Sequence, residues 1–202
     1  MGETERRLRD WPQERTVYLT LDFECDFGTA LSENRYGAVK HVDRLVELLE
    51  THDIPLTAFV QTELLEVKPD VVETLRASQT DVVFHPHSHT HKPRAETSIA
   101  EEVAQSTERY TEFFDEQPTG YRFPNGNIRP ADYELLAEHG YEFDASVFPS
   151  WRPNHFDNTE LPTRPHFLPD FGLIEIPFTV YSDSVRIPTA LSYIRLLGKS
   201  YS

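Results

Sequence analysis

Short apolar runs alternate along the chain with longer stretches in which apolar residues recur at helical spacing. The apolar runs that predict buried strands lie at 16–23, 56–60, 81–84, 119–123, 142–148 and 173–179. The amphipathic stretches that predict helices lie at 37–52, 69–77, 98–114, 130–139 and 190–197. The proline-rich stretch 151–169 predicts a long surface loop. Strands that alternate with helices in this way predict an α/β fold with a largely parallel sheet.

Polar residues follow several of these predicted strands at the point where each strand ends. Asp22, His87 and Arg122 all occupy such positions. In α/β barrels the active site is built there, from the loops that follow the strands. A doubly wound open sheet is the alternative architecture. However, no glycine-rich phosphate loop follows the first predicted strand, so a nucleotide site is not indicated.

The length of 202 residues and the 38% hydrophobic content predict one domain, at 16–202, after a polar N-terminal extension at 1–15. No apolar run approaches the roughly 20 residues that span a bilayer, so we expect no membrane insertion. Residues 1–15 contain no apolar leader, so a cytoplasmic location is the expectation. Secretion of a longer precursor is the alternative.

The net charge of −15 results from 34 acidic and 19 basic residues. Without a basic stripe, the chain is not expected to bind nucleic acid or an anionic membrane. The charge fits an ordinary acidic protein or adaptation to high salt, where ions screen self-repulsion. Because the acidic residues are spread along the chain, we favour the halophilic interpretation.

Four of the nine histidines lie within seven residues, in the run His85-Pro86-His87-Ser88-His89-Thr90-His91. Imidazole is a common ligand of Zn²⁺ and similar metals, so this cluster predicts a metal site. Three carboxylates at Asp22, Glu24 and Asp26 are candidates to complete it. Cys25 is the only cysteine, which excludes an internal disulfide and a cysteine-based metal site; we interpret it as a packing residue.

Three segments carry a resemblance to a known family. They are Thr20-Leu21-Asp22-Phe23-Glu24, His87-Ser88-His89-Thr90-His91 and Arg122-Phe123-Pro124-Asn125-Gly126. In order and spacing they resemble the motifs of the polysaccharide deacetylases with a NodB-homology domain, carbohydrate esterase family 4. The resemblance implies a distorted (β/α) barrel of about seven parallel strands. It also implies metal-dependent removal of acetyl groups from N- or O-acetylated saccharides.

The resemblance assigns roles to individual residues. Glu24, His87 and His91 would hold a divalent metal, with Zn²⁺ expected and Co²⁺, Ni²⁺ or Mn²⁺ as alternatives. Asp22 would act as general base, and Arg122 would pair with it and hold its orientation. Asp26 is the fallback ligand if Glu24 points away from the histidines.

Further residues are expected in or near the pocket. We interpret His85 and His89 as packing or outer-shell residues rather than ligands. Asp144 resembles a fourth motif and would line the pocket or be purely structural, and Trp151 would form an apolar wall or pack the loop. In the third motif, Pro124 precedes Asn125, which stands where the family usually has an aromatic residue. A backbone N–H there would stabilise an oxyanion.

One departure from the family concerns the proton donor. The family places a histidine on a late strand as general acid, and the predicted strand at 173–179 has none. The domain is therefore shortened at its C-terminus, uses another donor such as Glu175, or is a poor catalyst. Two alternatives to a saccharide deacetylase stay open: an amidase acting on a small non-sugar amide, and a non-catalytic domain that binds metal and glycan. The sequence predicts neither the particular sugar nor the oligomeric state.

Overall fold

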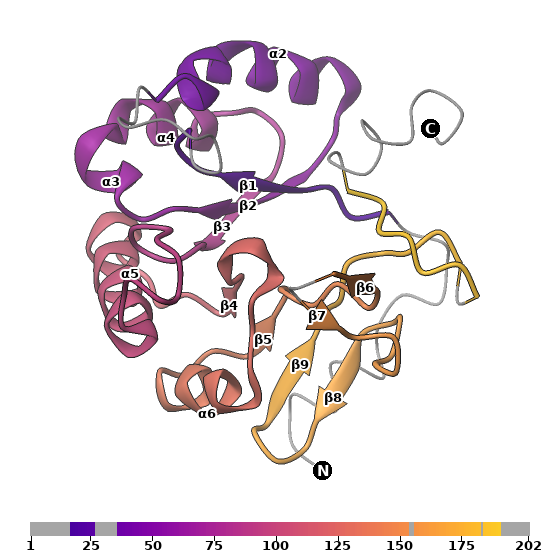
Figure 1. Ribbon diagram of the computed structural model, residues 1–202. Coiled ribbons are helices and arrows are strands. Elements are labelled where there is room, and N and C mark those ends of the chain that lie inside the picture. Colours follow the sequence, from indigo (N-terminus) through magenta and orange to yellow (C-terminus); the bar gives the residue numbers. More distant parts are fainter. Residues whose placement is uncertain (1–16, 27–35, 154–155, 183, 191–202) are drawn as a thin grey trace. The chain divides into compact units, whose positions relative to one another are not determined.

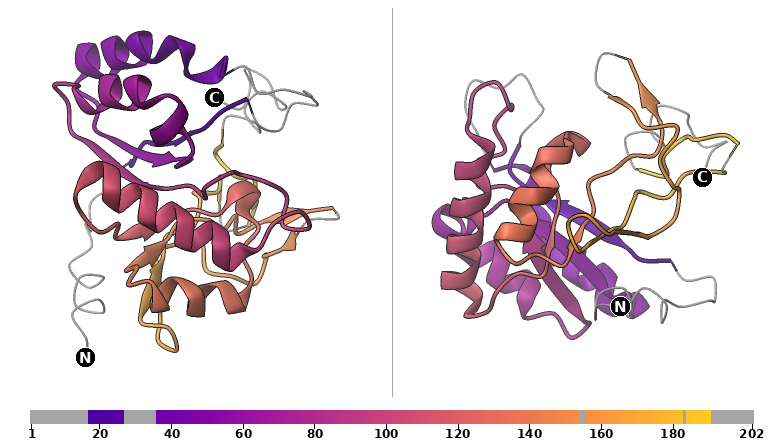
Figure 2. Two further views of the ribbon diagram at one scale, coloured as in Figure 1. Left: turned by 90° about the vertical axis from the view of Figure 1, so that its left-hand side faces the viewer. Right: turned by 90° about the horizontal axis from the view of Figure 1, so that it is seen from below.

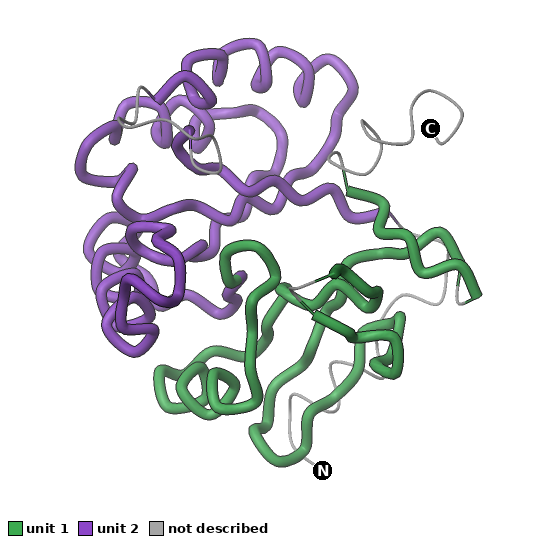
Figure 3. Tube along the Cα trace, in the orientation of Figure 1, with its two compact units in different colours: residues 1–11, 123–202 green, residues 12–122 purple. Residues whose placement is uncertain are grey.

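The computed structural model describes residues 17–26, 36–153, 156–182 and 184–190 (Figure 1). The chain divides into two compact units, which we call unit 2 (residues 12–122) and unit 1 (residues 1–11 and 123–202) (Figure 3). The predicted N-terminal extension and, from residue 191 onward, the predicted last helix lie outside the described residues. Among the helices of the described ranges, none is both long and apolar enough to cross a membrane.

Unit 2 contains a sheet of three strands in the order β1-β2-β3. These are β1 (Thr20–Phe23), β2 (Leu56–Val60) and β3 (Val82–Pro86). Both pairs are parallel, and the register places Asp22 beside Phe59 and Phe59 beside His85. Parallel pairing is therefore confirmed for these strands. Because their carboxyl ends meet at one edge of the sheet, the residues that follow β1 and β3 lie close together.

Helices supply most of the remaining core of unit 2. They are the 3₁₀ helix η1 (Ala38–His41), α2 (Val42–His52), α3 (Leu64–Val67), α4 (Pro69–Arg76) and α5 (Ile99–Phe114). Helices α2 and α4 lie side by side (Figure 2). Leu49 of α2 and Leu75 of α4 are fully buried in the same apolar cluster as Ala58 and Val60 of β2. The helical stripes predicted from the sequence are confirmed, whereas the short helix α3 was not predicted.

The last strand of unit 2, β4 (Gly120–Tyr121), is shorter than the predicted run at 119–123. Directly after it, the backbone N–H of Arg122 donates to the carbonyl oxygen of Pro86, with an N–O distance of 3.2 Å. This hydrogen bond places Arg122 next to the end of β3 and therefore near His87.

Unit 1 contains helices and strands that are mostly short. They are the 3₁₀ helix η2 (Pro124–Gly126), α6 (Pro130–Glu138), β5 (Phe143–Asp144), β6 (Trp151–Arg152), β7 (Phe156–Asp157), β8 (His166–Leu168) and β9 (Leu173–Glu175). Strand β9 pairs in parallel with β5 and antiparallel with β8, and β6 pairs antiparallel with β7.

The expectation of about seven parallel strands is therefore not met by the part of the chain that the structure describes. The stretch predicted as an irregular loop contains β6, β7 and β8. Strand β8 is joined to β9 by a tight turn at Gly172, whose φ is +71° and whose N–H donates to the carbonyl oxygen of Leu168. A turn this short allows only antiparallel pairing, because a parallel pair needs a crossover of a dozen or more residues.

Candidate metal centre

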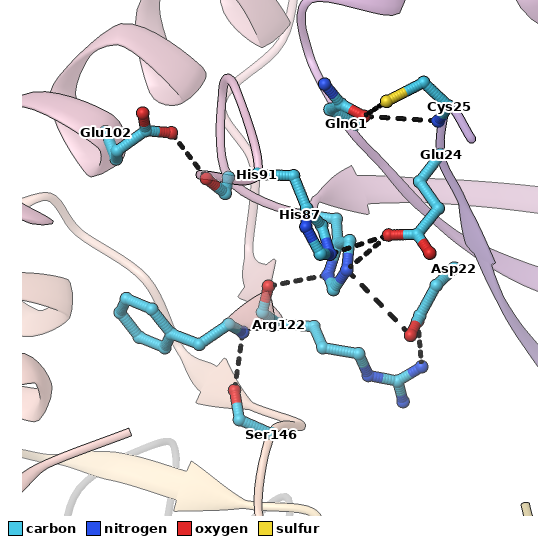
Figure 4. A network of polar contacts seen from close by, with 11 residues as sticks. Asp22, Glu24, Cys25, Gln61, His87, His91, Glu102, Arg122 and Ser146 are labelled. Carbon is cyan, nitrogen blue, oxygen red and sulfur yellow. Dashed lines mark hydrogen bonds and ion pairs between the residues drawn. The ribbon is translucent and has the colours of Figure 1, made fainter. Parts of the chain in front are cut away.

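Three potential ligands meet at the carboxyl ends of β1 and β3. Glu24 follows β1 directly, and His87 follows β3 directly. Oε2 of Glu24 lies 2.7 Å from Nε2 of His91 and 3.4 Å from Nε2 of His87 (Figure 4). One ligand atom from each of the three side chains lies within 4.8 Å of the other two. One carboxylate and two imidazoles suit a divalent cation that keeps open positions for water and substrate.

The ring of His87 is oriented by the backbone. Its Nδ1 lies 2.9 Å from the carbonyl oxygen of Arg122. A carbonyl oxygen only accepts hydrogen bonds, so Nδ1 carries a proton, and Nε2, which faces Glu24, is the nitrogen left for a metal. A backbone carbonyl of this kind commonly fixes the tautomer of a metal-binding histidine. The donor set therefore fits a metal such as Zn²⁺.

The charges of these side chains depend on one another. Burial by itself would raise the pKa of Glu24, but hydrogen bonds from His87 and His91 lower it to about 2. Burial would lower the pKa of His87, but the neighbouring carboxylates of Asp22 and Glu24 raise it. Glu24 is therefore ionised at neutral pH, which a metal ligand requires.

Asp22 stands beside the three ligands and has a different partner. Its Oδ1 accepts a hydrogen bond of 2.8 Å from Nη1 of Arg122, and its Oδ2 lies 3.9 Å from Nε2 of His87. The guanidinium of Arg122 also donates to Oγ1 of Thr20 and lies over the ring of Phe59, at 3.9 Å from the ring centroid. Held on three sides, the buried Arg122 fixes the carboxylate of Asp22, which is 36% exposed.

A family model described as Polysaccharide deacetylase matches residues 10–143. The chain belongs to the polysaccharide deacetylase family. That match includes His87, His91, Arg122 and the carboxylates at the end of β1. The predicted family is therefore confirmed.

Known members of the polysaccharide deacetylase family and solved structures resemble this chain. A peptidoglycan deacetylase of Helicobacter pylori is 26% identical over 119 residues, which make up 58% of this chain and 40% of that relative. The deacetylase PplD of Streptococcus pyogenes, solved with acetate, has a TM-score of 0.56 and 15% identity over 98% of this chain and 76% of that one. The PuuE allantoinase has a TM-score of 0.54 and 18% identity over 80% of this chain and 54% of that one. At these identities the two solved structures show a shared fold alone.

The residues next to Glu24 point to other partners. The two carboxylate oxygens of Asp26 accept hydrogen bonds of 2.9 Å and 2.8 Å from the backbone N–H groups of Gly37 and Ala38. Asp26 thus fixes the start of η1, and the fallback assignment as a metal ligand is not needed because Glu24 faces the histidines. Cys25 is buried, and its thiol donates to Oε1 of Gln61 at 2.8 Å, as suits a packing residue.

The two other histidines of the cluster are outside the Glu24–His87–His91 group. His85 is buried in β3, and its Nδ1 accepts a 3.3 Å hydrogen bond from the N–H of Gly120, which ties β3 to β4. Burial, with the positive charge of Arg122, lowers the pKa of His85 to about 4, so it is neutral. Nδ1 of His89 lies 3.1 Å from Oγ1 of Thr62. Both side chains contact neighbouring segments of unit 2, and their interpretation as residues outside a metal site stays a prediction.

Sequence reasoning missed Glu102, in the first turn of α5. Its buried carboxylate accepts hydrogen bonds from Ser88, His89 and Thr90, the three residues between His87 and His91. Burial alone would raise its pKa, but the hydrogen bonds from Ser88 and Thr90 lower it, so Glu102 is ionised. The sequence does show adjacent acids, Glu101 and Glu102, at the start of a predicted helix. It does not show which of them turns inward.

The remaining predicted pocket residues belong to unit 1. Asn125, after Pro124, is exposed and adopts a left-handed conformation with φ of +59°. Gly126 also has a positive φ, and a Cβ there would lie 2.5 Å from the ring of Phe148, so only glycine suits this position. Trp151 is 61% exposed and is not a packed wall of unit 1. A role for these residues in substrate binding stays a prediction.

Asp144 and Glu175, on the neighbouring strands β5 and β9, form a buried cluster. Oε2 of Glu175 accepts a hydrogen bond of 2.9 Å from Tyr133, and its Oε1 accepts one of 3.3 Å from the N–H of Val147. Asp144 accepts hydrogen bonds from the N–H and the hydroxyl of Ser146. Burial and the adjacent Asp144 raise the pKa of Glu175 well above its ordinary value, so this pair of carboxyl groups keeps a proton to higher pH than a free glutamate does. A role as proton donor to a substrate stays a prediction.

Proposed function

We propose that the chain is a metal-dependent hydrolase that removes acetyl groups from N- or O-acetylated saccharides. The observation that carries the proposal is the meeting of Glu24, His87 and His91 in a member of the polysaccharide deacetylase family. The name of the Helicobacter pylori relative, a peptidoglycan deacetylase, supports a saccharide as the acyl carrier.

Glu24, His87 and His91 would hold the metal, and Zn²⁺ is the expected ion because it favours this mixture of oxygen and nitrogen ligands. A divalent metal in such a site supplies Lewis-acid polarisation of a carbonyl and a water of lowered pKa. The surrounding residues prepare the site for this chemistry. The backbone carbonyl of Arg122 orients one imidazole, and the side chain of Arg122 orients Asp22.

Asp22 is the general base of the proposed reaction. Its carboxylate is solvent-accessible, its Oδ1 accepts from Nη1 of Arg122, and its Oδ2 faces His87. That second oxygen is available to accept a proton from the attacking water. The departing amine or alcohol needs one proton. Asp22 can therefore take a proton from the water and pass the same proton to the leaving group. Glu175 stays a second candidate for the proton donor.

The decisive experiment measures metal content and acetate release on the same purified chain. The chain is stripped with a chelator and reloaded with Zn²⁺ or Co²⁺. It is then incubated at low and high salt with N-acetylated and O-acetylated oligosaccharides and with small non-sugar amides. We expect one tightly bound metal and acetate release from an acetylated oligosaccharide. Hydrolysis of only the small amides would support the amidase instead, and glycan binding without turnover would support the non-catalytic domain.

The substitution Asp22→Asn tests the base within this experiment. We expect it to lower kcat by at least about 10²-fold, the lower bound for loss of general base catalysis, while metal content is unchanged. Glu47→Gln removes an exposed carboxylate from α2 and is the matched control, with activity equal to that of the parent. Full activity in Asp22→Asn would show that the base has been assigned to the wrong residue.

A further inference from the structure

The backbone between the two histidine ligands is held in an unusual conformation. Ser88 has a φ of +65° and His91 has a φ of +58°, in the left-handed region that side chains other than glycine rarely adopt. Such residues persist only where the surrounding structure holds them in place. The segment from Ser88 to Thr90 therefore needs contacts that fix it.

The carboxylate of Glu102 accepts hydrogen bonds from the donor groups of this segment. Its Oε2 accepts from the hydroxyl of Ser88 at 2.5 Å and from the backbone N–H groups of His89 at 2.9 Å and Thr90 at 2.8 Å. Its Oε1 accepts from the hydroxyl of Thr90 and, at 3.1 Å, from the hydroxyl of Thr97. A buried carboxylate that accepts several hydrogen bonds makes stronger bonds than a neutral acceptor.

The carbonyl groups of the same segment are held from the other side. The backbone N–H of Thr62 donates to the carbonyl oxygen of Ser88 at 3.1 Å, and that of Glu63 donates to the carbonyl oxygen of His89 at 3.2 Å. Residues 62 and 63 lie shortly after the end of β2. Their backbone N–H groups therefore hold the carbonyl groups of Ser88 and His89 in place. The N–H groups of His89 and Thr90 are instead bound by a side chain, that of Glu102.

The position of Glu102 suits a fixed support. It lies in the first turn of α5, where the helix dipole favours a negative charge, and its side chain is buried. Ser98 caps the same helix by accepting from the N–H of Glu101, so the first turn is itself held. A carboxylate on a capped helix is a rigid anchor for a loop that carries metal ligands.

We propose that Glu102 is a positioning residue that holds the segment from Ser88 to Thr90 so that His87 and His91 present their Nε2 atoms to one divalent cation. This inference rests on the proposed metal-dependent function. Glu102 is not one of the three residues of the candidate metal group. It acts only through the conformation of the segment between the two ligands.

The test compares Glu102→Ala with Glu102→Gln and with Glu101→Ala, in the full chain. Glu101 is the matched control, because it lies next to Glu102 on α5 and its side chain is exposed. Zn²⁺ affinity is measured by calorimetric titration of the metal-free proteins. We expect Glu102→Ala to weaken Zn²⁺ binding about 10- to 100-fold, as loss of an outer partner of a metal site does. Glu102→Gln keeps one acceptor oxygen and loses less affinity, and Glu101→Ala binds as the parent does.

A second measurement needs no metal. Hydrogen–deuterium exchange is followed in the metal-free proteins for a peptide that contains residues 87–91. We expect exchange of this peptide to become at least about tenfold faster in Glu102→Ala, because the amides of His89 and Thr90 lose a charged acceptor. The exchange of other peptides in α5 and β2 reports whether each variant is folded. If Glu102→Ala does not fold, the exchange of residues 87–91 is measured in Glu102→Gln instead.

The two measurements separate the inference from the proposed function. Unchanged exchange of residues 87–91 in a folded Glu102 variant would overturn the role of Glu102. So would Zn²⁺ affinity equal to that of the parent. A parent chain that binds no divalent metal would instead overturn the proposed function, whatever the exchange shows.

Discussion

Each compact unit holds a glutamate largely out of solvent, and the two carboxyl groups have different neighbours. In unit 2, Glu24 faces two imidazoles, whose hydrogen bonds outweigh the effect of burial and lower its pKa to about 2. In unit 1, Glu175 is buried beside a second carboxyl, Asp144, and its pKa is raised well above the ordinary value. The pKa of a glutamate is therefore lowered in unit 2 and raised in unit 1.

The comparison teaches that neighbours rather than burial decide what a buried acid can do. Burial alone raises the pKa of both glutamates, because it disfavours the charged form. Hydrogen bonds from the imidazoles of His87 and His91 outweigh the rise in pKa that burial causes for Glu24. An ionised carboxylate of this kind can bind a cation. The neighbouring carboxyl group of Asp144 adds to the rise in pKa that burial causes for Glu175. Glu175 instead takes part in hydrogen bonds inside unit 1, such as the one from Tyr133. Four predictions test this difference, and the first two rest on the proposed metal site.

The largest effect is expected for the same conservative substitution at the two sites. Glu24→Gln should lower Zn²⁺ affinity by more than about 100-fold, beyond the loss caused by an outer partner, because a neutral amide replaces an anionic ligand. Glu175→Gln should leave Zn²⁺ affinity unchanged. Calorimetric titration measures the Zn²⁺ affinity of both variants. Equal affinities would contradict the predicted difference between the two sites.

Metal binding should also stabilise the fold through the ligands of unit 2. At a free Zn²⁺ concentration of 100 times the Kd, we expect the free energy of unfolding to rise by about 2.7 kcal/mol. Urea unfolding with and without Zn²⁺ measures this gain. The gain should persist in Glu175→Gln and disappear in Glu24→Gln; a gain that survives in Glu24→Gln would place the metal elsewhere.

The hydroxyl of Tyr133 supports the buried acid of unit 1. Tyr133→Phe removes the 2.9 Å hydrogen bond to Oε2 of Glu175, and we expect a loss of about 2 kcal/mol of stability because a buried acceptor loses its partner. Urea unfolding measures the loss, while Zn²⁺ affinity should not change. Combining Tyr133→Phe with Glu175→Ala, which removes the acceptor, gives the coupling between the two side chains, and strict additivity would show that the bond contributes nothing.

The smallest change in stability is expected for Glu175→Gln at mildly acidic pH. At pH 5 its stability should lie within about 1 kcal/mol of the parent, because the amide keeps an acceptor for Tyr133. Because the folded state raises the pKa of Glu175 above the unfolded value of 4.5, the folded state binds more protons above that pH. The contribution of Glu175 to stability therefore falls as pH rises above about 4.5.

Unfolding by urea at pH 5, 7 and 8.5 measures this dependence. The parent should lose stability relative to Glu175→Gln as pH rises, and the two curves should converge toward pH 5. Parallel curves for the two proteins would contradict the assignment of the proton to Glu175.

Much of the candidate metal centre could be predicted from the sequence. Glu24, His87 and His91 are close to strand ends, and the parallel pairing of β1, β2 and β3 brings those ends together. The role of Asp26 could not be read in the same way. It lies two residues after Glu24, yet its carboxylate binds the backbone at Gly37. The chain leaves the strand after Phe23, so the alternation of faces along a strand no longer applies to Asp26.

The strands of unit 1 were less predictable. The stretch at 166–168 contains only three paired residues and is surrounded by prolines, so its local pattern indicates a loop. It becomes a strand because Gly172 turns the chain back and lets β8 pair with β9. Pairing of this kind depends on the partner strand, and a pattern confined to a few residues does not contain it.

The sequence by itself determined the family, the parallel strands of unit 2 and the residues offered as metal ligands, because strand periodicity and motif spacing are local properties of the chain. Only the tertiary structure decided the charge of each acid and the choice of Glu102 as the support of the loop. Those outcomes depend on which groups surround a carboxylate in space, and these groups come from distant parts of the chain. Glu24 and Glu175 are chemically identical in the sequence, and only their folded surroundings make one an anion and the other an acid.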